Sequence, residues 1–253
     1  MTAGTHTLEQ SGCRLWIDGV GSWLLWLGDE FTIGNASLSG GPRGYPGTDR
    51  QVGPPEGSTL PHKLPQGTFP LSMHDRCGIG SEEVPRSAEE GAKHLGVQAD
   101  LRTRHATFTR EREEYRIVPH GAVRLNDAPI DGETLLRNND RLTLGSDVSW
   151  RFLVPSPLSR SAVLRFESSH RPVPRVDGVV LLDQTCLLGP ERQTHIPCPA
   201  WPESVILFLR EGAFWAKTDG TISNSDGKTS APVPVNNGSI LSGEEWRFRV
   251  EMM

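Results

Sequence analysis

Cysteine is scarce in this chain, and long apolar runs and a leader segment are missing. The four cysteines among 253 residues are too few and too scattered for the disulfide scaffold of a small secreted protein. The longest apolar runs, such as WLLWL and VILFL, fall far short of the ~18 residues that a membrane span needs. The start, MTAGTHTLEQSGC, lacks the basic and apolar regions of a signal peptide. We therefore expect a soluble cytoplasmic protein with reduced thiols and no membrane partner.

An excess of basic charge is also lacking. The chain has 26 Lys and Arg against 31 Asp and Glu, which gives a formal net charge of −5. A chain of this balance has no overall field that would attract a polyanion. We therefore expect no nucleic-acid partner.

The common signatures of enzymes are absent from the sequence. It contains no Gly-x-Ser-x-Gly elbow, no His-Glu-x-x-His motif and no Gly-x-Gly-x-x-Gly after a strand. The stretch Asp226 to Thr229 ends like a P-loop, but Ile222 stands where that motif needs a glycine. Asp-Gly between β segments is instead typical of a hairpin turn. We expect a non-enzymatic protein without a cofactor.

Two groups of Cys and His were considered as metal ligands. One is His74 with Cys77, and the other is Cys186 and His195 with Cys198. A structural zinc site needs four ligands in matched pairs, and neither group reaches four. We therefore expect no metal site.

Short apolar runs between Gly, Asp and Asn turns indicate an all-β fold, because no window keeps a helical period over three turns. The best strand is 148–154, in which alternate residues are apolar. The end of the chain repeats this pattern, since SWRFLV and EWRFRV nearly coincide. The patterns predict that Trp16, Trp150 and Trp246 lie inside, whereas Trp201, next to a proline, is expected to be exposed.

An internal repeat divides the chain. The stretches 14–34 and 163–189 both read strand, turn, apolar strand, turn, short strand and glycine. The first half is longer because residues 36–96 hold 11 Gly and 8 Pro, a composition typical of irregular chain. Within this insertion, residues 87–95 could form two helical turns with a capping box. The predicted domains are 12–156, with the insertion, and 160–253.

The stretch from Asp100 to Phe152 resembles the second half of a forkhead-associated domain. RHA at 104–106, LND at 125–127 and LTLG at 142–145 occur in the family's order, and FTIG at 31–34 matches the strand end that usually reads Ile-Gly-Arg. With its second half, the chain is similar to bacterial tandem proteins of this type. The resemblance implies two consecutive antiparallel β-sandwiches of the forkhead-associated (FHA/SMAD-like) class, the second of them degenerate. It also implies a binding module in which the loops at one end of the sandwich bind a phosphothreonine peptide.

The loops depart from the family at almost every phosphate ligand. Asn35 replaces the first arginine, Arg102 the serine and Thr103 the second arginine, while the Ser-x-Asn-Gly turn has become Pro119 to Ala122. The resemblance leaves two loop-bracing residues, Gly34 and His105. The binding residues expected at these loops are Asn35, Arg102, Thr103, Arg104, His120 and Asn126.

These departures favour a signalling or adaptor module that binds a protein or peptide partner, phosphorylated or not, without strong phosphothreonine dependence. One alternative is a phosphothreonine-peptide reader in which Arg102 and Arg104, two residues apart on a strand, form a replacement anion site. An alternative of another class is a hydrolase with its site at the interface of the two domains.

Overall fold

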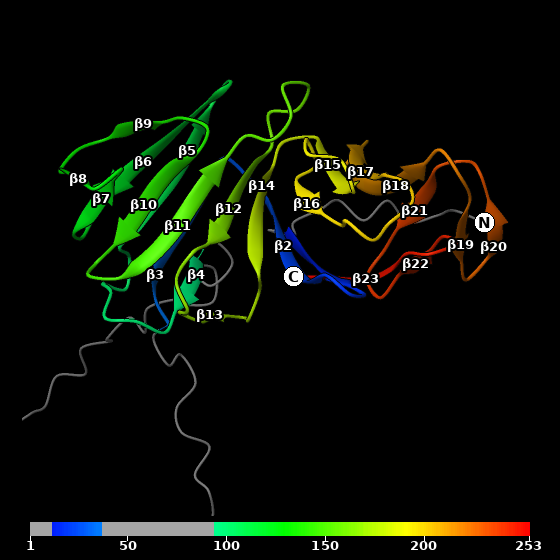
Figure 1. Ribbon diagram of the computed structural model, residues 1–253, viewed down its shortest axis with the longest axis horizontal. Coiled ribbons are helices and arrows are strands. Elements are labelled where there is room, and N and C mark those ends of the chain that lie inside the picture. The colour runs from blue at the N-terminus through cyan, green and yellow to red at the C-terminus, as the bar shows by residue number, and fades with distance from the viewer. Residues whose placement is uncertain (1–11, 37–93) are drawn as a thin grey trace, which may run out of the picture. The chain divides into compact units, whose positions relative to one another are not determined.

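The computed structural model describes residues 12–36 and 94–253. The expected all-β class is confirmed, since these residues form 23 strands and no helix (Figure 1). Consequently, no described segment is a helix with the length and apolarity to cross a membrane. The strands of the first half are β1 (Gly12–Ile17), β2 (Gly21–Leu27), β3 (Glu30–Asn35), β4 (His94–Val97), β5 (Ala106–Glu111), β6 (Glu114–Pro119), β7 (Val123–Leu125), β8 (Ala128–Ile130), β9 (Thr134–Leu136), β10 (Asp140–Leu144) and β11 (Val148–Leu153).

The second half repeats this series with one short addition, β13. Its strands are β12 (Ala162–Phe166), β13 (Pro172–Val173), β14 (Gly178–Leu182), β15 (Thr185–Gly189), β16 (Ile196–Pro197), β17 (Val205–Arg210), β18 (Ala213–Thr218), β19 (Ile222–Asn224), β20 (Gly227–Thr229), β21 (Val233–Val235), β22 (Ile240–Ser242) and β23 (Arg247–Met252). The Asp226-Gly227 turn joins β19 to β20 in an antiparallel hairpin, as predicted.

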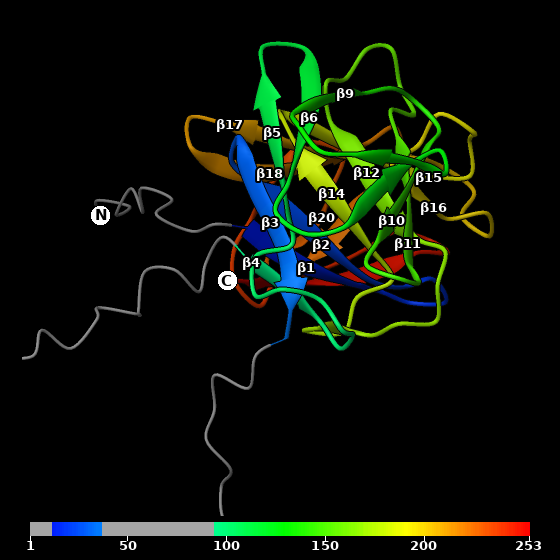
Figure 2. The same cartoon turned by 90° about the vertical axis from the view of Figure 1, so that its left-hand side faces the viewer.

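The strands form three sheets. Two are smaller and share one order, since β4-β3-β5-β6-β9 in the first half matches β16-β15-β17-β18-β21 in the second, and β13 adds to the first of them. The third sheet has 12 strands in the order β20-β19-β22-β23-β1-β2-β14-β12-β11-β10-β7-β8 (Figures 1 and 2). The expectation of purely antiparallel sheets is wrong, because β3 pairs with β4, β15 with β16 and β2 with β14 in parallel.

The largest sheet contains strands from both halves. The expectation of two separate β-sandwiches is therefore corrected. The first strand of each half lies beside the last strand of the other sequence repeat: β1 pairs with β23, and β12 pairs with β11. The junction predicted at 156–160 therefore connects two hydrogen-bonded strands of one sheet. In the middle, β2 and β14 lie side by side.

Two hydrophobic cores lie on opposite faces of the 12-stranded sheet. Trp150 is fully buried in one, the Trp150 core, and Trp246 is 3% exposed in the other, the Trp246 core, so the burial predicted for both indoles is confirmed. The strands common to both cores bury alternate residues on opposite faces. On β2, Trp23 and Leu25 belong to the Trp246 core, whereas the residues between and after them, Leu24 and Trp26, belong to the Trp150 core.

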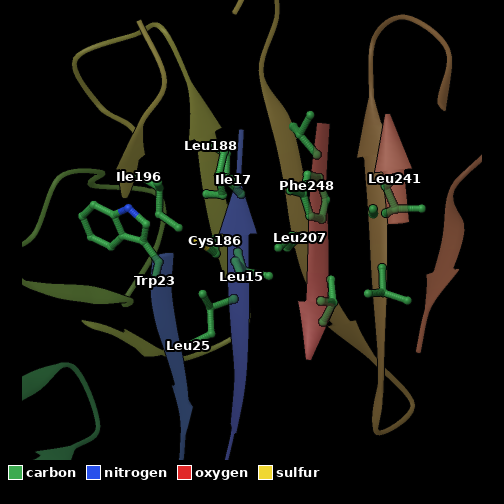
Figure 3. Close-up of a cluster of buried hydrophobic side chains, with 14 of the residues drawn as sticks. Leu15, Ile17, Trp23, Leu25, Cys186, Leu188, Ile196, Leu207, Leu241 and Phe248 are labelled. Carbon is green, nitrogen blue, oxygen red and sulfur yellow. The ribbon is translucent and has the colours of Figure 1, made fainter. Parts of the chain in front are cut away.

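Figure 3 shows how side chains distant in the sequence meet in the Trp246 core. Leu15 and Leu25 from the start of the chain lie with Cys186, Leu207 and Phe248 from the second half. A strand buried on both faces reads as a continuous apolar run, and this accounts for WLLWL on β2 and VVLL on β14.

Three local predictions are wrong. Trp16 is 42% exposed because its strand turns that residue away from the Trp246 core, and Trp201 is only 4% exposed because its ring packs on Trp246. Leu95 was placed in the irregular insertion and its helix, but residues 94–97 form β4 and Leu95 is buried beside Ile33. Residues 87–93 of the expected helix lie outside the described residues. His74 and Cys77, the first candidate metal-ligand group, also lie outside them.

Candidate functional site

The loop end of the first half is organised around His105, which directly precedes β5 and is 4% exposed. Its Nδ1 accepts a hydrogen bond from the backbone N–H of Arg102 at 3.1 Å. Its Nε2 lies 2.9 Å from the carbonyl oxygen of Ala122, and the backbone N–H of Gly145 also points to Nε2 at 3.1 Å. The backbone N–H of Gly145 donates to the same carbonyl at 2.8 Å. One buried ring thus joins the loops that precede β5 and β7 to the β10–β11 turn.

Backbone contacts hold the same loops together. The carbonyl oxygen of His105 accepts from the N–H groups of His120 and Gly121, at 2.8 and 3.0 Å. Two glycines permit the close approach, because a Cβ on Gly34 would overlap the carbonyl of Thr103 and one on Gly121 would overlap the ring of His105. The loop surface is therefore fixed by packing within the chain.

We expect His105→Leu to destabilise the protein by about 2 kcal/mol, because the part-buried Arg102 N–H would lose its acceptor and the Ala122 carbonyl would keep only the Gly145 N–H. Urea unfolding followed by circular dichroism measures this change. His120→Leu serves as the control, since the His120 side chain is exposed. Equal losses of stability in the two variants would contradict the bracing role of His105.

Four of the predicted binding residues gather on this braced surface. Arg102, Thr103 and His120 are exposed, and Asn35 is half-buried at the end of β3. The Arg102 guanidinium donates to the His120 carbonyl at 2.6 Å, and Asn35 donates its N–H to the Arg102 carbonyl at 2.8 Å. His120 Nε2 lies 2.8 Å from the hydroxyl of Thr107, a residue that the sequence interpretation missed. The sequence signal for Thr107 was a polar residue between the apolar residues Ala106 and Phe108 of β5.

Two predicted binding residues have other surroundings. The Arg104 guanidinium lies 3.6 Å from the carboxylate of Glu30. Asn126 lies in the β7–β8 turn, where its amide donates to Asp140 at 2.8 Å. Ala122 and Gly145 are at the opposite end of β7 and β10, so Asn126 does not join the His105 loops.

The proposed pairing of Arg102 with Arg104 also rests on a wrong premise. Residues 101–105 form a bend and not a strand, so alternation does not place the two side chains on one face. Their guanidinium groups bind different protein groups, the His120 carbonyl and the Glu30 carboxylate.

The second half carries a different set of residues at the matching positions. The pairing of β15 with β17 places Ser204 where the pairing of β3 with β5 places His105. Its hydroxyl donates to the carboxylate of Glu191, so it braces one side chain and not several loops. The fully buried imidazole of the second half is His195, whose Nδ1 accepts from the Leu187 N–H at 3.0 Å. Burial lowers the pKa of His195 to about 4.

The thiols of the described residues are reduced and buried. Burial raises the pKa of Cys13 and of Cys198 to about 12 and also raises the pKa of Cys186. Such thiols are poor nucleophiles and poor metal ligands, because the thiolate is the reactive form. Residues 12–36 and 94–253 contain no group of three or more His, Cys, Asp or Glu placed to hold a metal ion.

Comparison of the chain with protein-family models, with curated proteins and with solved structures gave no significant match.

Proposed function

We propose that this chain is a non-enzymatic interaction module whose two halves form forkhead-associated-like β-sandwiches that share the 12-stranded sheet, and that it binds a protein partner through the His105 loops of its first half. The observation that carries the proposal is the combination of a buried bracing ring with exposed side chains directly above it. Arg102, Thr103 and His120 are exposed, yet the backbone N–H groups of Arg102 and His120 are hydrogen-bonded to His105. A preorganised polar surface loses little entropy when it binds.

The strand order supports a repeated architecture in the two halves. The shared order of the two smaller sheets, each with one parallel pair at the same place, indicates that both halves use one architecture. The Trp150 core is built from residues of the 12-stranded sheet and of the sheet that contains β3 to β6. Such a core between two sheets is what a sandwich requires.

The geometry argues against strong dependence on phosphate. A phosphate dianion needs several converging donors, of which a guanidinium is the strongest. The Arg102 guanidinium already donates to a backbone carbonyl, and Arg104 is paired with Glu30. We therefore place protein contact, and not phosphate capture, at this surface.

The junction of the halves gives little support to a hydrolase. A site at the interface would need a cavity with a nucleophile and a base. The strands at this junction instead carry buried apolar side chains on both faces, among them Leu24, Leu25, Val179 and Val180.

Affinity capture from the native cell tests the proposal with the full chain as bait. We expect a partner to bind equally before and after phosphatase treatment, and to be lost with the double variant Arg102→Ala/His120→Ala. Arg137→Ala is the matched control, because Arg137 is an exposed arginine after β9, away from these loops. Loss of the partner on dephosphorylation would favour the phosphopeptide reader, and retention by the double variant would contradict the assigned surface.

A further inference from the structure

One turn is built in the same way in the two halves. At the β9–β10 turn the Asp140 carboxylate accepts the N–H of Arg137 at 2.7 Å, and at the β21–β22 turn the Ser239 hydroxyl accepts the N–H of Asn236 at 2.9 Å. Both side chains bind the residue three positions earlier in the chain. Ser239 of the second half therefore stands where Asp140 stands in the first half.

A neighbouring hairpin is tied to this turn in the first half. The β7–β8 and β19–β20 hairpins both have two-residue turns, in which Asn126 matches Ser225. The Asn126 side chain donates to Asp140 at 2.8 Å and accepts the N–H of Arg141 at 2.9 Å. The shorter Ser225 hydroxyl bonds within its own turn, to Asp226 at 3.3 Å. The described part of the second half therefore has no bridge between the two turns.

A polar hollow opens at the unbridged turns. It measures about 510 Å³ and is lined by residues of both turns and of β19, β22 and β23. This volume lies within the ~300–1,000 Å³ range of small-molecule sites. Most of the lining is neutral and polar, and Ile240, which is 43% exposed, adds an apolar side chain. The hydroxyl and amide side chains are Ser223, Asn224, Ser225, Asn236, Ser239 and Ser242.

The hollow has one carboxylate and one guanidinium, from Asp226 and Arg247. Arg247 begins β23, and Ser242 lies opposite it on β22. Arg247 forms no ion pair with a described acidic side chain, so the two opposite charges line one hollow without neutralising each other by contact. A ligand group that binds both must accept from the guanidinium and donate to the carboxylate. A hydroxyl group does both.

We propose that this hollow binds a neutral polyhydroxylated ligand, a mono- or disaccharide. Its lining combines donors with acceptors and has no formal net charge, which matches a ligand whose hydroxyl groups both donate and accept. Ile240 offers an apolar contact to the C–H face of a sugar ring. An anion would be repelled by Asp226 and a cation by Arg247. All lining residues belong to the second half, so the proposal does not depend on the function assigned to the His105 loops.

NMR shift mapping with the isotope-labelled full chain tests this proposal. The probes are D-glucose, D-galactose, D-mannose and N-acetyl-D-glucosamine. We expect at least one of these sugars to shift the amide resonances of residues 223–226 and 236–242 saturably. Asp226→Ala should weaken its binding about tenfold or more, because a charged acceptor is lost. Asp127→Ala is the matched control, since Asp127 has the same place in the β7–β8 turn, and it should leave binding unchanged.

A second variant closes the hollow without removing its charges. Ser225→Asn/Ser239→Asp places in the second half the two side chains that bridge the turns of the first half. We expect this double variant to fill the hollow and to abolish sugar binding. Circular dichroism should show a folded chain, because Ser225 is exposed and Ser239 is half-buried.

Five outcomes would overturn the proposal. These are no saturable shift with any of the four sugars at millimolar concentration, shifts confined to residues outside the hollow, equal weakening by Asp127→Ala and Asp226→Ala, undiminished binding by the double variant, and tighter binding of glycine or inorganic phosphate than of every sugar. The last result would assign the hollow to an ionic ligand. None of these results bears on the His105 loops, so failure here leaves that surface untouched.

Discussion

Trp150→Ala and Phe248→Ala are each expected to lower the stability of the whole described body by about 4 kcal/mol, because each removes a fully buried aromatic side chain. The two residues belong to different cores. The cores nevertheless share β2, β12 and β14, whose alternate residues serve one core or the other. Urea unfolding should therefore show a single transition in both variants, shifted to lower denaturant in each.

Two independently folding domains would behave differently. Each substitution would then shift one phase of a two-phase curve and leave the second phase at its original midpoint, and this result would contradict the shared strands. Leu158→Ala is the control, since Leu158 is 94% exposed. It should leave the transition where it is in the unaltered protein.

A second large effect is expected from acid. Burial lowers the pKa of His195 from 6.5 to about 4, so the folded protein keeps a neutral imidazole at a pH where the unfolded chain binds a proton. By linkage, stability is lost as the pH falls from 6.5 towards 4. The shift corresponds to about 3 kcal/mol of stability from this one residue.

The variant His195→Gln isolates this contribution, because other groups also titrate in that range. We expect the variant to be less stable at pH 7, and to lose about 3 kcal/mol less than the unaltered protein between pH 6.5 and 4. Urea unfolding at a series of pH values measures how the free energy of unfolding changes with pH in the variant and in the unaltered protein. Identical slopes in the variant and the unaltered protein would rule out His195 as the source.

Local patterns predicted the strands well, because the alternation of buried and exposed residues depends only on the strand itself. They placed Trp150 and Trp246 inside, and both are buried. They could not show that β1 pairs with β23, because ladder hydrogen bonds join backbone groups that are the same at every residue. The continuous apolar runs on β2 and β14 were the available signal for strands buried on both faces.

The candidate site was predicted in part for a similar reason. The resemblance to forkhead-associated domains pointed to Gly34, Arg102, Thr103 and His120, and the structure brings these residues to one loop surface. Asn126 was placed with them, although β7 separates its turn from that surface. Surfaces that combine β1 with β22 and β23 could not be foreseen, because these strands are far apart in the sequence.

The exchange of first strands also bears on how the protein emerges from the ribosome. The Trp150 core includes Val179 and Leu181, so the amino-terminal half cannot close until most of the chain has been made. The Trp246 core joins Cys13 to Val250, and its completion waits until Val250 has been made. Domains usually fold in order of synthesis, but here the β1–β2 hairpin lacks its outer neighbours β23 and β14 until those strands have been made. The nascent chain therefore exposes the apolar strand β2 for longer than two sequential domains would.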